Sequence, residues 1–154
     1  MHLEGKFDVN AEPAEVYAFL TDPRKVSGHM PDVTNVDIQD DDHFTVTARV
    51  GVSHIKGTMV MKLEIRDRQP PTGTTVVARG SGLASVIDMV TSFKIERTGG
   101  LTVVSWRGDV SISGKLAAFG PQGLLERLAR KNIDAFIEGI RKGLQSEVPG
   151  IPAP

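Results

Sequence analysis

The feature that most constrains the fold is a long stretch of alternating residues followed by one amphipathic helix. From about Val36 to Ile112, apolar residues recur at every second position and short turns separate the runs. This pattern is typical of consecutive antiparallel strands that bury one face. From Pro121 to about Leu144 the apolar residues recur at helical spacing, opposite a charged face. We therefore expect an antiparallel sheet whose apolar face is covered by the C-terminal helix.

Two short helices are predicted between the first strand and the rest of the sheet. Residues 2–9 alternate as a half-buried strand. Pro13 follows at a position where a helix can begin, because the missing N–H of proline costs nothing in a first turn. Asp22 and Pro23 then end this helix and begin a second one, which ends before Pro31. The predicted fold class is α+β.

Composition excludes several classes of function. The 154 residues fit one domain, predicted over residues 1–145, with residues 146–154 as a disordered tail rich in proline and glycine. A formal net charge of −1 provides no basic face for nucleic acid. The absence of cysteine excludes disulfides and cysteine-ligated metals. No apolar run is long enough to span a membrane, so we expect a cytoplasmic protein with at most peripheral contact at the inner face of the membrane.

The predicted inner face of the sheet is poor in bulky side chains. Glycine recurs there, three inward methionines are flexible, and aromatic residues make up only 5% of the chain. Two interpretations stay open. Either the sheet and helix enclose a cavity for an apolar molecule, or the glycines let the sheet curl onto the helix and the methionines are ordinary core. The apolar junction at residues 111–120, between the last strand and the helix, would form the mouth of such a cavity.

Four stretches carry a resemblance to a known family: GKFDVNAEPAEVYAFLTDP, HMPDVTNV, RGSGLASVIDMVTSFKIE and ISGKLAAFGPQGLLERLARKNIDAFIEGI. The last is the most specific, since Gly114, Leu116, Ala117 and Gly120 lie at family positions before the helix. Together they resemble the G-subunit family of carbon monoxide dehydrogenase, within the START and birch-pollen-allergen-like superfamily of polyketide cyclases and lipid carriers. The resemblance covers about residues 2–144. It departs at Asp32, where the family usually has glycine.

The resemblance implies a helix-grip fold, in which a curved antiparallel sheet wraps around a long C-terminal helix. It further implies a non-catalytic accessory protein that recruits a molybdenum-type dehydrogenase to the membrane and holds a quinone or similar lipid. No covalent cofactor is expected. The residues expected to line the cavity are Met59, Met61, Ile87, Met89, Phe93, Trp106, Leu116, Phe119, Leu124, Leu128 and Phe136. The glycines expected to shape it are Gly57, Gly80, Gly82, Gly108, Gly114 and Gly120.

The histidines and aspartates do not form a recognisable catalytic or metal-binding motif. The four histidines have no metal-ligand spacing. His29 is interpreted as a surface residue, with a hydrogen bond to a quinone carbonyl at the cavity rim as the alternative. The aspartates at residues 40–42 lack the spacing of a calcium loop and fit a solvated turn. Asp88 and Asp109 are expected to point outward, away from any substrate.

Two further functions remain as alternatives. An enzyme of the same fold, such as a polyketide cyclase or hydrolase, would need buried acid–base groups in the cavity. A ligand-free protein-interaction domain would have a filled interior. The predicted inner face is almost entirely apolar, with Thr91 as the polar inward group of its strand, and this favours a binding module over an enzyme.

Overall fold

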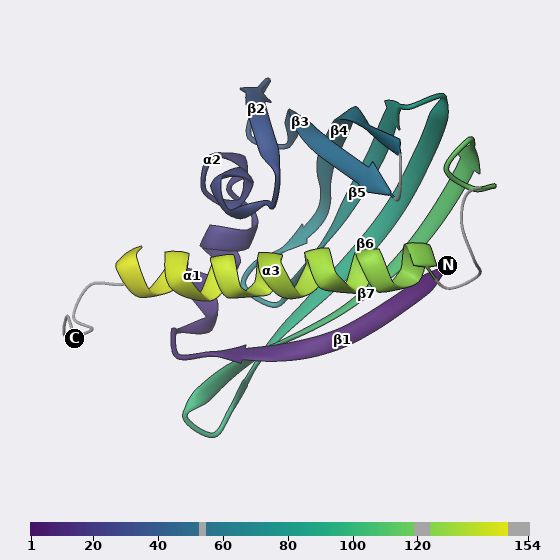
Figure 1. Ribbon diagram of the computed structural model, residues 1–154. Helices are drawn as coiled ribbons and strands as arrows, with labels where there is room; N and C mark the ends of the chain where they lie inside the picture. Colours follow the sequence, from purple (N-terminus) through teal and green to yellow (C-terminus); the bar gives the residue numbers. More distant parts are fainter. Residues whose placement is uncertain (53–54, 119–123, 148–154) are drawn as a thin grey trace.

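The computed structural model describes residues 1–52, 55–118 and 124–147, and it is built on one antiparallel sheet of seven strands (Figure 1). The strands are β1 (His2–Val9), β2 (Val33–Ile38), β3 (His43–Val52), β4 (Ile55–Gln69), β5 (Gly73–Gly82), β6 (Ser85–Thr98) and β7 (Leu101–Gly114). Their order in the sheet is β1-β7-β6-β5-β4-β3-β2. Consecutive hairpins therefore run from β2 to β7, and β1 pairs with β7 at the far edge.

The helices lie where the sequence predicts them. Between β1 and β2 come α1 (Pro13–Leu20), α2 (Pro23–Val26) and a 3₁₀ turn, η1 (Ser27–His29), and the chain ends in α3 (Leu124–Glu147). Figure 1 shows α3 lying across the curved sheet, with α1 and α2 near its C-terminal end. The predicted α+β helix-grip fold is confirmed. The part of the chain that the structure describes contains no helix long and apolar enough to cross a membrane.

Local signals fix the boundaries of these helices. Pro13 is the first residue of α1. The Asp22 side chain accepts a hydrogen bond from the Arg24 backbone N–H at 2.9 Å, and so caps α2 directly after α1 has ended. Helix α3 reaches Glu147, two residues beyond the predicted domain boundary at 145. The remainder of the predicted tail, residues 148–154, lies outside the described residues.

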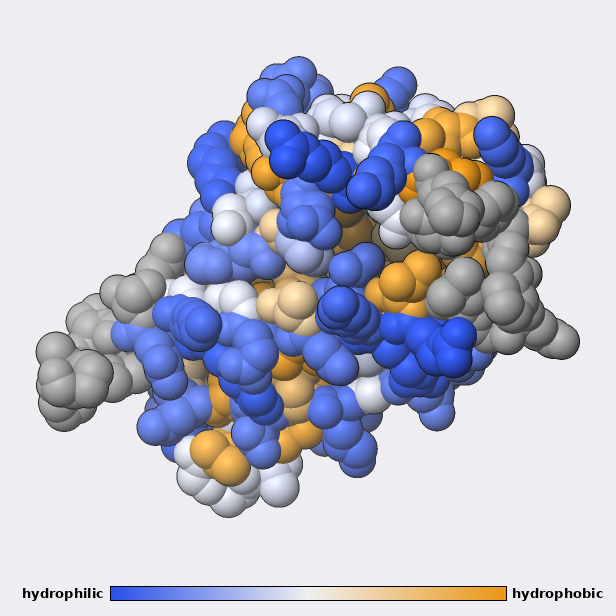
Figure 2. All heavy atoms as spheres, in the orientation of Figure 1, coloured by the Kyte–Doolittle hydropathy of each residue, from blue (hydrophilic) through white to orange (hydrophobic). Residues whose placement is uncertain are grey.

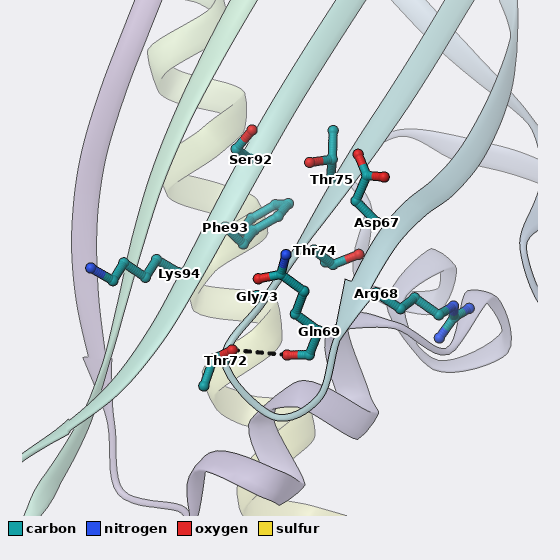
Figure 3. A pocket seen from close by; sticks show the side chains of 10 residues that line it. All are labelled: Asp67, Arg68, Gln69, Thr72, Gly73, Thr74, Thr75, Ser92, Phe93 and Lys94. Atoms are coloured by element: carbon teal, nitrogen blue, oxygen red, sulfur yellow. Dashed lines mark hydrogen bonds between the residues drawn. The ribbon is translucent and has the colours of Figure 1, made fainter.

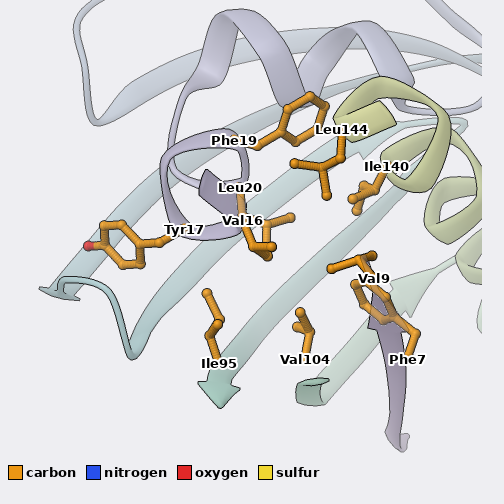
Figure 4. Close-up of a cluster of buried hydrophobic side chains, with 10 residues drawn as sticks. All are labelled: Phe7, Val9, Val16, Tyr17, Phe19, Leu20, Ile95, Val104, Ile140 and Leu144. Atoms are coloured by element: carbon orange, nitrogen blue, oxygen red, sulfur yellow. The ribbon is translucent and has the colours of Figure 1, made fainter. Parts of the chain in front are cut away.

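The largest apolar cluster lies at the end of the sheet near α1 (Figure 4). There α1 and the C-terminal half of α3 pack against β1, β6 and β7. Its buried members are Phe7, Val9, Val16, Tyr17, Phe19, Leu20, Ile95, Val104, Ile140 and Leu144. A second cluster joins α2 to β3, β4 and β5, and a third contains Met59 and Leu116. The buried core is therefore divided into separate clusters instead of running continuously under α3.

Two glycines let α3 approach η1 and α1 closely. A Cβ atom at Gly143 would lie 2.6 Å from Cζ of Phe19, and one at Gly139 would lie 3.0 Å from the backbone oxygen of His29. The rings of Phe19 and His29 are in contact, with their centroids 5.3 Å apart. Because the two glycines are four residues apart, they lie on the same face of α3. We call this contact of Gly139 and Gly143 with Phe19 and His29 the α3 anchor.

The hairpin between β5 and β6 has an unusual turn sequence. Its two central residues, Leu83 and Ala84, have φ angles of 54° and 53°, which are the left-handed values that a two-residue type I′ turn requires. Asparagine and glycine adopt such angles most readily, whereas leucine and alanine are strained there. The turn is held in part by the backbone N–H of Lys115, which donates to the Ala84 oxygen at 3.0 Å.

Candidate ligand-binding site

The strand register determines which side chains face α3. In β4 and β5, Met61 lies opposite Gly80. In β5 and β6, Ala78 lies opposite Met89, and in β6 and β7, Phe93 lies opposite Trp106. Since side chains alternate along a strand, these residues share the face that α3 covers. The structure therefore places the predicted inward residues of β4 to β7 on one surface.

Several apolar side chains on this inner surface are only half-buried, although α3 lies over them. On the sheet they are Met61, Ile87, Met89, Phe93 and Trp106. On the helix, Leu128 and Phe136 are also half-buried. Side chains packed tightly between a sheet and a helix would lose nearly all of their accessible surface. Figure 2 shows the surface hollowed beside α3, with hydrophobic residues inside the hollow.

Burial changes along α3. In its N-terminal half, Leu125, Leu128 and Ile133 are half-buried. In its C-terminal half, Ile140 is 1% exposed and Leu144 is 4% exposed. The C-terminal half is therefore fixed by the α3 anchor, whereas the N-terminal half leaves part of its apolar face accessible. We call the half-buried inner surface of β4 to β7, together with this half of α3, the inner apolar surface.

Other predicted lining residues pack closely against their neighbours. Met59 and Leu116 are each 2% exposed and form a buried cluster. A Cβ atom at Gly57 would collide with the Leu83 side chain, and one at Gly80 would lie 3.2 Å from Cγ of Met61. At these two glycines, neighbouring side chains occupy the inner surface. Phe119 and Gly120 lie outside the described residues, as does the side chain of Leu124.

The remaining predicted glycines have two different roles. Gly82 and Gly114 have φ angles of 150° and 90°, and a Cβ atom on either would collide with neighbouring backbone. Both therefore permit a close approach of two chain segments. Gly108 instead lies opposite Thr91, where a Cβ atom would be 3.3 Å from Oγ1 of Thr91. The sequence analysis did not predict Leu83 or Leu125 as part of the site, and it did not predict the α3 anchor. The spacing Gly139-x-x-x-Gly143 was a signal for the anchor.

Charged side chains of the strands lie on the other face. From β4 to β7, each charged residue in the segments 55–65, 74–82, 85–95 and 102–114 alternates with the inward residues and so points outward. Asp88 forms an ion pair with Arg79 at 3.6 Å, and Oδ1 of Asp109 lies 2.8 Å from Nδ1 of His2. The predicted outward direction of both aspartates is confirmed.

The histidines in the described part of the chain contact neighbouring side chains. His29 lies in the α3 anchor, half-buried beside Phe19. Nδ1 of His43 lies 2.8 Å from Oδ1 of Asp40. The hydrogen bond to Asp40 raises the pKa of His43 above its ordinary value of 6.5, and the same bond lowers the pKa of Asp40 below 3.8. Among the described residues, no group of three or more histidine, aspartate or glutamate side chains could hold a metal ion.

A polar depression of about 500 Å³ opens on the outer face of the sheet (Figure 3). It is lined by Asp67, Arg68, Gln69, Thr72, Gly73, Thr74, Thr75, Ser92, Phe93 and Lys94. A Cβ atom at Gly73 would lie 2.9 Å from the backbone oxygen of Phe93, so only glycine fits closely at this position. In Figure 3, Arg68 and Lys94 point in opposite directions and α3 lies behind the sheet. This depression shares Phe93 with the inner apolar surface, and its charged groups do not converge on one point.

Comparison with known proteins defines first the structural class and then the family. The fold is that of the helix-grip proteins. Residues 5–145 match the family described as the G subunit of carbon monoxide dehydrogenase (CoxG), and the chain belongs to this family. A comparison with curated proteins found no match.

Solved structures with the same fold come from several bacteria. A conserved protein from Geobacillus kaustophilus matches with a TM-score of 0.86 and 20% identity, over 95% of this chain and 96% of that one. A START superfamily protein from Mycobacterium smegmatis matches with a TM-score of 0.72 and 10% identity, over 96% and 99% of the two chains. The ZhuI aromatase/cyclase from Streptomyces sp. R1128 matches with a TM-score of 0.67 and 16% identity, over 97% and 98%. At these identities the matches show the fold alone.

Proposed function

We propose that this chain binds a hydrophobic, quinone- or lipid-like molecule between its sheet and α3. The observation that carries the proposal is the inner apolar surface, where side chains such as Met61 and Met89 on the sheet and Leu128 on α3 keep accessible area. Binding an apolar ligand would remove this area from water, which is favourable by roughly 25 cal/mol per Å². Methionine side chains are flexible and suit an adaptable apolar wall.

The chemistry of the surface favours binding over catalysis. An acid–base enzyme of this fold would need ionisable groups facing its substrate. In the described segments of β4 to β7 that form the inner face, the charged side chains point outward. Membership of the CoxG family supports the second part of the proposal, in which the protein serves as a non-catalytic accessory protein of a molybdenum-type dehydrogenase and brings that enzyme to the membrane.

The ligand-binding part of the proposal is tested with the single tryptophan of the chain. Trp106 lies on the inner apolar surface, so its fluorescence should be quenched saturably by a neutral naphthoquinone such as menadione. Two adjacent residues provide a matched pair of variants. Met89 faces α3 and is half-buried, whereas Val90 is on the outer face and is 46% exposed.

We expect Met89→Asp to weaken quenching by menadione at least tenfold, because a carboxylate inside the binding space loses hydration when an apolar ligand enters. We expect Val90→Asp to bind menadione like the wild type. Circular dichroism of both variants verifies folding, and Met89→Gln replaces Met89→Asp if the latter does not fold. Equal quenching in the folded inner-face variant and the outer-face variant would refute the proposed site. The dehydrogenase part is tested separately, by capture of dehydrogenase activity from the same organism on immobilised protein.

A further inference from the structure

The two edges of the sheet differ in how well they are protected. An edge strand has one row of unpaired backbone N–H and C=O groups, and proteins usually shorten, distort or cover such a strand. At one edge, β2 has six residues, an irregular register between Val33 and Asn35, and a contact with η1. At the other edge, β1 has eight residues that pair with β7 in an unbroken register (Figure 1). The β1 edge is therefore the longer and more regular of the two.

Every second residue of β1 directs its backbone groups toward the free edge. The Met1 nitrogen donates a hydrogen bond to the Val110 oxygen at 2.8 Å, and the Val110 N–H donates to the Met1 oxygen at 2.8 Å. Met1 therefore faces β7, and because the direction alternates along an antiparallel strand, the odd-numbered residues of β1 face β7 as well. The residues that face the free edge are His2, Glu4, Lys6 and Asp8.

The centre of this edge is open in the part of the chain that the structure describes. The backbone oxygen of Asp8 accepts a hydrogen bond from Nε of Arg141 on α3 at 3.1 Å, which confirms its outward direction and covers that end of the strand. The edge-facing N–H and C=O groups of Glu4 and Lys6 have no hydrogen-bond partner among the described residues. These groups are therefore available to a strand that docks from outside.

The exposed side chains of the edge-facing residues are complementary to a second β1 strand. When two β1 strands pair antiparallel about Gly5, Glu4 of each lies opposite Lys6 of the other, and His2 lies opposite Asp8. A shift of two residues in one direction would place Glu4 opposite Glu4, and a shift in the other direction would place Lys6 opposite Lys6. Like charges directly opposite one another are destabilising. The charge pattern therefore selects the pairing that is centred on Gly5.

The same pairing also matches the backbone groups. Glu4 and Lys6 both face the edge, so they would form a hydrogen-bonded pair in which each residue donates one bond and accepts another. The two-fold axis at Gly5 repeats this pair. Lys6 has no ion pair with a described residue of its own chain, so its charge is free to interact with Glu4 of a second copy.

We propose that the free edge of β1 binds β1 of a second copy of this chain, and that the two sheets become continuous in a two-fold dimer. This proposal is independent of ligand binding. Leu3 and Phe7 remain buried in the core of their own chain, so the contact uses backbone hydrogen bonds and exposed charges. Interfaces of this small size are typically weak, and we expect a reversible dimer whose population rises with protein concentration.

Charge reversal at the edge tests the pairing by sedimentation velocity over a wide range of protein concentrations. Lys6→Glu would place like charges opposite each other in both symmetry-related pairs, so we expect it to raise the dimer Kd at least about tenfold. Glu4→Lys should do the same. The double variant Glu4→Lys/Lys6→Glu restores opposite charges and should dimerise like the wild type. Lys62→Glu makes the same charge change on the exposed outer face of β4 and should leave the Kd unchanged.

A second pair of variants tests the backbone hydrogen bonds. Lys6→Pro removes an N–H that faces the free edge, so the hydrogen bonds between β1 and β7 are kept. Because proline cannot donate to a docking strand, the dimer should be lost. Lys6→Gln removes only the charge and should weaken the dimer by a smaller factor. Circular dichroism verifies that each variant is folded.

Amide hydrogen exchange locates the interface on the strand. In concentrated wild-type protein the amides of Glu4 and Lys6 should exchange more slowly than in dilute protein, because the second copy then covers them. The amides of Leu3 and Gly5 face β7 and should exchange slowly at both concentrations. This alternation distinguishes pairing at the β1 edge from a dimer that uses another surface.

Three results would overturn the proposed dimer. The first is a wild type that stays monomeric at every concentration. The second is a dimer whose Kd is the same in Lys6→Glu and Lys6→Pro as in the wild type. The third is a double reversal that does not recover the dimerisation lost in the single variants. Because none of these measurements involves a ligand, their failure leaves the proposed function standing.

Discussion

The α3 anchor makes a prediction whose sign is opposite to that of helix propensity. Alanine stabilises a helix interior by about 1 kcal/mol relative to glycine, so Gly143→Ala would stabilise an unconstrained helix. In the folded protein the new Cβ atom would lie 2.5 Å from Nε2 of His29 and 2.6 Å from Cζ of Phe19. Phe19 is 2% exposed and has little room to move.

The net effect follows from these two opposing contributions. Overpacking a close contact costs about 1–3 kcal/mol, and the propensity gain offsets about 1 kcal/mol of it. Because the new atom would collide with two rings, we expect a net loss in the free energy of unfolding of about 1–2 kcal/mol. For a chain of this length that corresponds to a fall in Tm of about 2–8 °C. Thermal unfolding followed by circular dichroism measures it.

Three control variants isolate the cause. Gly28 has no atom within 4 Å of a Cβ position, so Gly28→Ala should change stability by no more than about 0.5 kcal/mol. Ala135 is exposed on α3, so Ala135→Gly should cost about 1 kcal/mol through propensity alone. In a His29→Ala background one collision is absent, and Gly143→Ala should cost less than in the wild type. A rise in Tm for Gly143→Ala in the wild-type background would refute the anchor.

Three further predictions concern the turn, the His43–Asp40 pair and α3. Ala84→Gly should raise the free energy of unfolding by about 1 kcal/mol, because glycine adopts a φ of 53° without strain; an unchanged midpoint in urea would contradict the strained turn. His43 has a raised pKa, so its contribution to stability is present below pH 6.5 and is lost as the pH rises through that raised pKa. His43→Gln should therefore destabilise the protein at about pH 5.5, where Asp40 is still ionised, and have little effect at about pH 8.5; a difference that grows with pH would contradict this sign. In hydrogen exchange, amides of residues 125–133 should exchange faster than those of 140–144 and become slower when menadione binds; uniform exchange along α3 would count against a partly accessible N-terminal half.

Much of the fold could be predicted from periodicity and from helix-start signals. The change from a period of two to helical spacing correctly separated β7 from α3, and Pro13 and Asp22 marked the starts of α1 and α2. Alternation also gave the correct face for Met61, Met89 and Thr91. These features depend on residues close in the sequence, so no knowledge of the tertiary structure was needed.

The site was harder to predict because its details depend on contacts between distant segments. Alternation shows that Met59 and Met61 face the same way, but it cannot show that Met59 is buried against Leu116 while Met61 remains half-buried. A glycine in a strand leaves a space, but the sequence does not show that Leu83 fills the space over Gly57. Likewise, only the register of β6 and β7 shows that Thr91 lies opposite Gly108.

Native mass spectrometry of protein purified without detergent, followed by solvent extraction and identification of any bound molecule, tests most directly whether this chain holds an apolar ligand. We expect a near-stoichiometric mass excess from a neutral, hydrophobic, oxygen-containing compound, which disappears when the protein is denatured. Protein that carries no ligand, and gains none after incubation with menadione, would refute ligand binding and favour a ligand-free interaction domain.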